Sequence, residues 1–264
     1  MNPPNAEISR APALLRLARY AAVTSAVLLA IAGPGHRFGV LPFEVALKGP
    51  FLIGVLAALV TFLVAGGVLL TSRAGRSQPQ GWRNWLALVF GAVVVIGAAY
   101  WYGKLRAAPL LHDVSTDTRS PPPFVEAGPR RAADHATNSL DYLAEYEVDS
   151  AAVNAPALQT EFYPELKTIP LRLKPTEAFA TAEKAVRAMH WEIVAIVPAE
   201  GRIEATVTSP YFGMRDDIAI RVRSERNGRG SIVDVRSSAR VGANDGGSNA
   251  RHIHAYAERL IKPN

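Results

Sequence analysis

Three uncharged apolar runs lie within the first hundred residues, and no run of similar length follows them. Residues 49–72 form a run of 24 residues without a charged side chain, and residues 84–103 a run of 20. A helix rising about 1.5 Å per residue crosses roughly 30 Å of hydrocarbon over such lengths. Tryptophan and tyrosine lie at the two ends of the second of these runs, as is typical of membrane interfaces. The pattern predicts a membrane anchor in residues 1–106, with helices at about 50–71 and 84–103.

The first apolar run is shorter and has two interpretations. Residues 20–35 carry no charge, and the arginines before them can extend their charged ends toward the interface. This favours a retained transmembrane helix at about 13–33. A basic segment, a short apolar core and Ala30-x-Ala32 also fit a cleaved signal peptide, and the sequence does not distinguish the two.

Beyond the anchor, the spacing of apolar positions predicts a water-soluble α+β domain in residues 166–264. Helical spacing follows Pro175 and returns in residues 248–262. Apolar runs, partly alternating with polar residues, predict strands at 169–173, 191–197, 203–207, 217–223 and 231–237. The order β-α-β-β-β-β-α predicts one antiparallel sheet with helices on one face.

Turn residues and composition add two further expectations. Asn227-Gly228 separates the last two predicted strands, and both residues accept positive φ, which predicts a hairpin. Residues 107–165 are rich in Pro, Ala, Asp and Ser and include three consecutive prolines. Because polyproline cannot continue a helix, this segment is expected to be an extended connector with one short helix at 138–147.

The charge distribution excludes one class of function and favours an orientation. The net charge of +6 lies entirely in residues 1–103, because residues 104–264 hold 21 basic and 21 acidic side chains. A neutral domain binds nucleic acid poorly, so the expected partner is the lipid bilayer. Basic residues in the short loops place the N-terminus in the cytoplasm. We therefore expect an integral protein of a bacterial inner membrane with a periplasmic C-terminal domain.

Charge is also unevenly divided inside the soluble part. Residues 104–165 carry five basic and ten acidic side chains, whereas residues 201–264 carry eleven basic and seven acidic ones. Either the acidic stretch packs across the basic half of the same molecule, or the basic half offers a surface to an acidic ligand.

The densest polar group lies on the last hairpin and in the loop beyond it. Eight residues form the candidate binding site: Asp217, Arg221, Arg223, Asp234, Arg236, Arg240, Asp245 and Asn249. Alternation places the hairpin members on one face, where arginines can grip carboxylate or phosphate. The alternative is structural: the strand charges neutralise one another and Asp245 caps the last helix.

Four stretches resemble the DUF1499 family, whose members are of uncharacterised function and often carry membrane spans. They are His112 to Thr118 with Pro121-Pro122, residues 188–206, Asp216-Asp217, and Asp234 to Gly242 followed by Asp245 to Ala250. The resemblance covers roughly residues 109–262. The chain departs from the family pattern at His252 and His254, where arginine is usual. If those positions hold an anion, this chain is expected to hold it less well or in a pH-dependent way.

These observations lead to three hypotheses. The first is a non-enzymatic, membrane-anchored envelope protein that binds another envelope protein or a small acidic ligand, with no cofactor, no metal and no nucleic acid. The second is a hydrolase or transferase acting on envelope material, with Asp217 or Asp245 as base and Arg236 or Arg240 as an anion clamp. The third makes the domain a structural cover for spans that assemble with other membrane proteins. No nucleophile elbow or phosphate loop is present to favour an enzyme.

Overall fold

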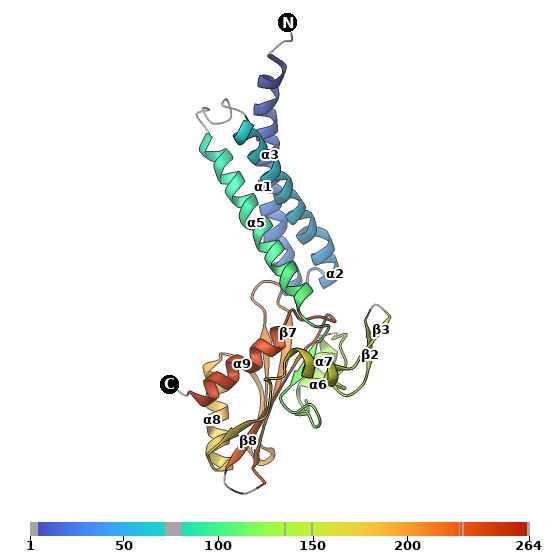
Figure 1. Ribbon diagram of the computed structural model, residues 1–264, viewed down its shortest axis with the longest axis vertical. Coiled ribbons are helices and arrows are strands. Elements are labelled where there is room, and N and C mark those ends of the chain that lie inside the picture. The colour runs from blue at the N-terminus through green and yellow to red at the C-terminus, as the bar shows by residue number, and fades with distance from the viewer. Residues whose placement is uncertain are drawn as a thin grey trace. The chain divides into compact units, whose positions relative to one another are not determined.

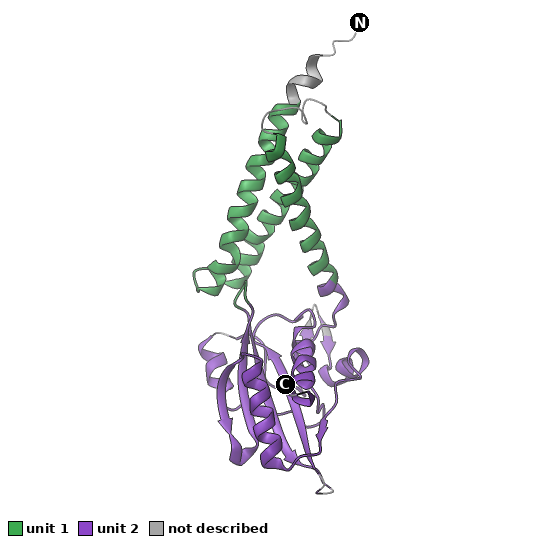
Figure 2. Cartoon of the chain, turned by 90° about the vertical axis from the view of Figure 1, so that its left-hand side faces the viewer, with its two compact units in different colours: residues 1–103, 210–213 green, residues 104–209, 214–264 purple. Residues whose placement is uncertain are grey.

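The chain divides into two compact units, which Figure 2 colours separately. The computed structural model describes residues 5–71, 81–134, 136–148, 150–226, 228 and 230–262. Unit 1 contains residues 1–103 together with residues 210–213, and unit 2 contains residues 104–209 and 214–264.

Unit 1 is built from long apolar helices (Figure 1). They are α1 (Asn5–Arg37), α2 (Phe43–Ala46), which continues through the π-helical turn η1 (Leu47–Phe51) into α3 (Leu52–Thr71), and α5 (Gly81–Ala107). Gly49 has non-helical angles, φ −86° and ψ −105°, directly before Pro50, which explains the kink between α2 and α3. Among the described residues, three helices are long and apolar enough to cross a membrane, which confirms the three predicted apolar helices.

Small residues let the helices of unit 1 approach closely. Thr61 of α3 donates a hydrogen bond to the carbonyl oxygen of Ala18 in α1 (3.3 Å). A Cβ atom added at Gly91 of α5 would lie 2.9 Å from the carbonyl oxygen of Ala58 in α3. Only glycine therefore fits at this crossing. Residues 210–213 also belong to this unit, and the Phe212 ring lies 5.4 Å from that of Phe51.

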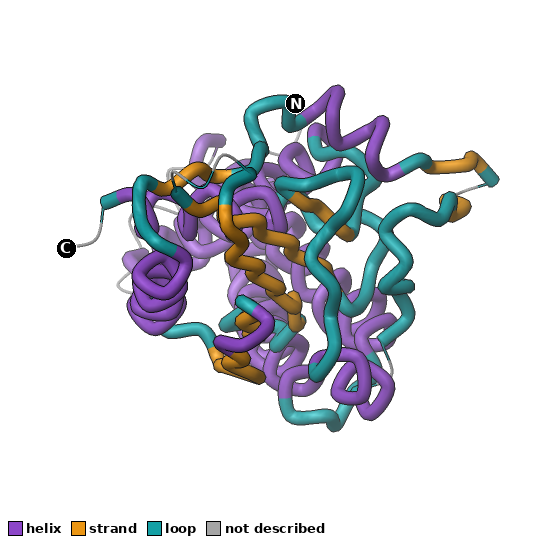
Figure 3. The backbone as a smooth tube through the Cα atoms, turned by 90° about the horizontal axis from the view of Figure 1, so that it is seen from below, coloured by secondary structure: helices purple, strands orange, loops and turns teal. Residues whose placement is uncertain are grey.

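Unit 2 contains a six-stranded antiparallel sheet, whose strands are orange in Figure 3. Its strands are β1 (Asp113–Ser115), β4 (Ile169–Leu171), β5 (Glu192–Val197), β6 (Arg202–Thr208), β7 (Arg215–Ser224) and β8 (Ser231–Ala239). The order is β1-β8-β7-β6-β5, and β4 also pairs with β8. In the register of β7 and β8, Arg221 lies opposite Asp234 and Ala219 opposite Arg236.

One face of this sheet is apolar and is covered by two amphipathic helices. The helices α8 (Pro175–Ala188) and α9 (Ser248–Ile261) pack on side chains such as Ile218 and Val235, which are fully buried. The hydroxyl of Tyr256 is buried here and donates to the carbonyl oxygen of Ala182 (3.2 Å). Burial of each large apolar side chain contributes about 1.5–3 kcal/mol, so this layer is the main source of stability.

The opposite face is polar, and most of it is also buried. Residues 113–142, here called the cover segment, lead from the edge strand β1 across this face and include α6 (Ala127–Ala133). The Glu204 carboxylate accepts hydrogen bonds from the backbone N–H groups of Val125, Glu126 and Ala127 (2.8–3.2 Å). Because these N–H groups belong to the first turn of α6 and the two residues before it, a sheet carboxylate caps the helix that covers it.

The predicted order of strands and helices in residues 166–264 is confirmed, and the cover segment is the main difference. Residues 107–165, interpreted from composition as an extended connector, contribute β1 to the sheet and also contain α6, β2 (Tyr146–Val148), β3 (Ala151–Val153) and α7 (Ala155–Phe162). The short helix predicted at 138–147 is wrong. The carbonyl oxygens of Asn138 and Leu140 accept hydrogen bonds from Arg131 and Arg236 instead. Asn227 of the predicted turn lies outside the described residues, while β7 and β8 pair as the hairpin requires.

Candidate functional site

Arg236 lies at the centre of the polar face and is fully engaged. Its guanidinium donates two hydrogen bonds to the Asp113 carboxylate, at 3.0 and 2.7 Å. It also donates to the carbonyl oxygens of Pro122 (3.3 Å) and Leu140 (2.6 Å), and it lies over the Phe124 ring at 4.9 Å. Only 4% of the side chain is exposed. Four of its five N–H groups donate hydrogen bonds to β1 and to the residues that follow it, so Arg236 holds the cover segment on the sheet.

Asp234 joins two arginines of the neighbouring strand. Arg221 and Arg223 donate to its carboxylate at 3.0 and 2.6 Å, and Thr168 adds a hydroxyl donor at 2.5 Å. Both arginines also reach Asp117 of the cover segment, at 3.1 and 3.3 Å. Arg221 and Asp234 thus pair across the strands, as the structural alternative to a binding site expects, and Asp117 from outside the hairpin also takes part.

Asp217 is the most enclosed carboxylate of the set. It is completely buried and accepts four hydrogen bonds: one from Arg131 (3.0 Å), two from Arg240 (2.9 and 2.7 Å) and one from Thr206 (2.8 Å). Burial lowers the pKa of Arg131, and the Asp217 carboxylate opposes that change. A carboxylate with four donors and no exposure cannot take a proton from a substrate, so this geometry does not support Asp217 as a catalytic base.

Asp245 and Asn249 lie apart from these arginines and hold the start of α9. The Asp245 carboxylate accepts from the N–H groups of Gly247 and Asn249, both at 2.7 Å. Asn249 is completely buried, where it accepts from Ser237 (2.6 Å) and donates to the carbonyl oxygen of His112 (2.9 Å). The N-cap residue of α9 is Gly247 rather than Asp245, but the Asp245 carboxylate accepts from the N–H of Asn249 in the first turn and so has a structural role. The eight predicted residues do not form one site.

The uneven charge of the two halves now has a structural explanation. Acidic residues of the cover segment pair with basic residues of the sheet: Asp113 with Arg236, Asp117 with Arg221 and Arg223, and Asp134 with Arg215 and Arg240. The expectation that the acidic stretch packs across the basic half is confirmed. Most of the predicted site residues therefore form ion pairs within the protein.

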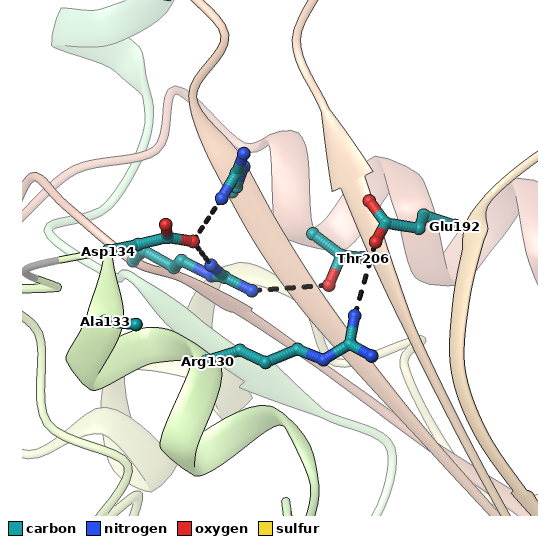
Figure 4. A pocket seen from close by; sticks show the side chains of 7 residues that line it. Arg130, Ala133, Asp134, Glu192 and Thr206 are labelled. Atoms are coloured by element: carbon teal, nitrogen blue, oxygen red, sulfur yellow. Dashed lines mark hydrogen bonds and ion pairs between the residues drawn. The ribbon is translucent and has the colours of Figure 1, made fainter. Parts of the chain in front are cut away.

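One part of the polar face remains open, and the close-up in Figure 4 shows it. A pocket of about 280 Å³ is lined by Arg130, Ala133, Asp134, Glu192, Thr206, Arg215 and Arg240. The side chains of Arg130 and Arg215 are about half exposed, at 49% and 45%. Arg240 forms the base of the pocket, with 5% of its side chain exposed. Three guanidinium groups and two carboxylates give the pocket a net charge of +1.

Only Arg240 of these lining residues was in the predicted site. Arg215 could have been included, because it continues the alternation of Asp217 and Arg221 two residues earlier and faces the same side of β7. Arg130 lies in α6 and Asp134 is the C-cap residue of that helix, whose position depends on contacts with strands about 80 or more residues away. No local pattern of sequence indicates that proximity.

A second titratable cluster lies beside the N-terminal end of α9. Asp216 points away from Asp217, accepts a hydrogen bond from Ser248 (3.2 Å) and lies 3.6 Å from Nδ1 of His252. Burial raises the pKa of Asp216 to about 7, and the nearby Asp245 carboxylate adds to the rise. Burial lowers the pKa of His252 to about 4. His254 lies 3.0 Å from Glu165, so both histidines face carboxylates.

Among the described residues, no group of three or more His, Asp or Glu side chains is arranged to hold a metal ion. Asp113 and Asp117, which the sequence brings near His112, are each directed toward arginines. The pocket is lined by three guanidinium groups, and such groups bind anions through paired hydrogen bonds.

Fold and site together define an α+β domain with a charged, covered sheet, carried on a chain with three apolar helices. A family model described as "Protein of unknown function (DUF1499)" matches residues 113–260, which is more than half of the chain, and the chain belongs to this family. The match includes the cover segment, the sheet and most of α9. No curated protein and no solved structure matches the chain.

Proposed function

We propose that the protein is a membrane-anchored binding module of the cell envelope, and that it binds an acidic partner or ligand at the pocket around Arg130, Arg215 and Arg240. The observation that carries the proposal is the contrast in exposure on the polar face. Arg221, Arg236 and Arg240 are at most 16% exposed, and Arg223, at 41%, is paired with two carboxylates. Arg130 and Arg215 are 49% and 45% exposed, and each is paired with one carboxylate beside a concave surface. Exposed arginines around a pocket can exchange their present partners for a ligand at low cost.

In this proposal, the three apolar helices anchor the binding module beside a lipid bilayer. The three apolar helices suit three spans, and the packing of α1 against α3 through Thr61 and Ala18 supports a retained first helix. Basic residues in the short loops favour a cytoplasmic N-terminus and a periplasmic unit 2 in a bacterial inner membrane.

This orientation can be tested by labelling introduced cysteines, because the chain has none of its own. Arg187→Cys places a thiol on exposed α8 of unit 2, and Ser77→Cys places one between the second and third apolar helices. A membrane-impermeant maleimide added to intact cells is expected to label only Arg187→Cys. Labelling of Ser77→Cys alone would reverse the orientation.

Binding is tested with the full chain in detergent, using thermal melting against acidic ligands and cross-linking in cells. Succinate, glutamate and phosphate are suitable first ligands. We expect a ligand-dependent rise in melting temperature that is lost in the Arg130→Ala, Arg215→Ala double variant. Arg187→Ala is the matched control, because Arg187 is also exposed (59%) and pairs with one carboxylate, Glu183. If no ligand stabilises the wild type and no partner is cross-linked through unit 2, the binding function is wrong.

A further inference from the structure

We infer that the pocket recognises a phosphate monoester group, and that Asp134 occupies the position of that group when the pocket is empty. The inference rests on the proposed binding function and specifies its ligand. It follows from the contacts of the three arginines. Arg240 donates hydrogen bonds both to the buried Asp217 and into the pocket, whereas Arg130 and Arg215 are about half exposed.

Arg240 has one part of its guanidinium fixed and one part directed at the pocket. Its Nε and Nη2 atoms donate to Asp217, at 2.9 and 2.7 Å, inside the sheet layer. Its Nη1 atom instead donates to Asp134, which lines the pocket. Because the Asp217 contact holds the guanidinium plane, the Nη1 donor stays in place whether or not Asp134 remains. Arg240 is therefore a preorganised donor at the base of the site.

Asp134 is more exposed than Asp113 and Asp117, the other acidic residues of the cover segment that pair with arginines of the sheet. It lies at the end of α6, and 36% of its side chain is exposed. The partners of its carboxylate are Arg215 and Arg240, both of which line the pocket. Asp113, by contrast, is 2% exposed and is paired with Arg236 by two hydrogen bonds. Asp134 can turn into solvent without leaving a buried charge, so it can be displaced by a stronger anion.

The third arginine is also available. Arg130 pairs with Glu192 at 3.3 Å, and the two side chains are 49% and 63% exposed. Such a surface pair contributes little to stability and exchanges readily. In Figure 4 the Arg130 side chain extends toward Glu192, and the Asp134 carboxylate lies apart from the Arg130 guanidinium group. An anion in the space between them can reach donors from Arg130, Arg215 and Arg240.

Three converging guanidinium groups favour phosphate over carboxylate. A phosphate monoester has three terminal oxygens and carries −1.5 to −2 charges near neutral pH, whereas the competing Asp134 carboxylate has two oxygens and one charge. The volume of about 280 Å³ suits a small group, because sites for whole drug-sized ligands extend from roughly 300 to 1,000 Å³. The expected ligand is thus a phosphate monoester on a small molecule or on a lipid headgroup.

The test is titration of the full chain in detergent with inorganic phosphate, glycerol 3-phosphate and succinate, at fixed ionic strength. We expect both phosphates to bind more tightly than succinate. Arg215→Ala is expected to weaken phosphate binding at least tenfold and Arg130→Ala several-fold. Asp134→Asn is expected to tighten it several-fold because it removes the internal competitor. Arg187→Ala is expected to leave the affinity unchanged.

A second measurement separates the two sources of phosphate. The chain is placed in nanodiscs of phosphatidylcholine with or without phosphatidic acid, and glycerol 3-phosphate is titrated. Competition by phosphatidic acid supports a lipid headgroup, and binding that is unchanged by the lipid supports a soluble phosphate. All variants are first compared by unliganded melting; if Arg215→Ala melts early, Arg130→Ala and Asp134→Asn carry the test.

Two results would overturn the inference in different ways. Tight succinate binding that depends on Arg215, without phosphate binding, would contradict the phosphate assignment and leave the binding function in place. Phosphate binding that is the same in the wild type and in the Asp134 and Arg130 variants would show that the pocket is not its site.

Discussion

Arg236 and Arg130 both pair with carboxylates on the polar side of the sheet, but 4% of the first side chain is exposed and 49% of the second. The ion pair of Arg236 with Asp113 and the ion pairs of the buried carboxylates Asp217 and Asp234 are here called the sealed pairs. The pairs Arg130–Glu192 and Arg215–Asp134 are called the open pairs. A buried ion pair is costly to break because one charge is left without solvent, whereas an exposed pair contributes little. Identical residue types therefore stabilise the fold in one place and, in our proposal, bind a ligand in the other.

The largest effect is expected from breaking a sealed pair. Arg236→Ala leaves the Asp113 carboxylate buried without its partner and removes the contacts with Phe124, Pro122 and Leu140. We expect a loss of about 3–5 kcal/mol in the free energy of unfolding of unit 2, or on the order of 10 °C in melting temperature. Amide hydrogen exchange of β7 and β8 in the full chain measures this unit directly.

The Asp113→Leu, Arg236→Met double variant is the control for this prediction. It removes both charges, so we expect it to be less destabilised than Arg236→Ala. Exchange rates in Arg236→Ala close to those of the wild type would mean that the cover segment is not held by this pair, and the comparison between sealed and open pairs would fail.

A pH-dependent effect of intermediate size is expected at Asp216. Its pKa is raised from the ordinary 3.8 to about 7 in the folded chain, so the folded state binds a proton that the unfolded state has lost between these values. The stability that Asp216 contributes is present below about pH 4 and is lost as the pH rises toward 7, by on the order of 1.4 kcal/mol per unit of pKa shift. His252, with a lowered pKa, contributes in the opposite direction between about pH 4 and 6.5.

Because His252 opposes the change, the informative quantity is the difference between the wild type and Asp216→Asn. We expect Asp216→Asn to gain stability relative to the wild type by a few kcal/mol between pH 4 and pH 7. Urea unfolding at several pH values measures this difference. A difference that stays constant from pH 4 to pH 8 would show that Asp216 titrates normally and is hydrated like the open pairs.

The sequence predicted the apolar side of this fold well and the polar side poorly. Alternation and helical spacing are local patterns, and they located β5 to β8, α8 and α9 because the apolar face requires them. The cover segment has no such pattern. Asp113 meets Arg236 across 123 positions of sequence, and Glu204 caps a helix that begins 77 positions earlier. Charge counts indicated that the two halves attract each other, but which acid meets which arginine depends on the register of the sheet.

A smaller effect is expected at the edge of the sealed region. Thr168 donates its hydroxyl to Asp234 at 2.5 Å, and Thr168→Val removes this donor while nearly keeping the shape. Arg221 and Arg223 continue to neutralise the carboxylate, so we expect a loss of only about 1–2 kcal/mol. Hydrogen exchange of β8 amides measures it. A loss as large as that of Arg236→Ala would mean that the two arginines do not compensate Asp234.

The smallest effect on stability is expected in the pocket. Arg130→Ala breaks an exposed pair with Glu192, as Arg187→Ala does with Glu183, and each is expected to change the free energy of unfolding by less than about 0.5 kcal/mol. The two variants should therefore melt alike and differ only in ligand binding, which Arg130→Ala alone weakens. If Arg130→Ala melted several degrees below Arg187→Ala, Arg130 would belong with the sealed pairs. The pocket would then be part of the packed structure, and its arginines would not be available to bind a ligand.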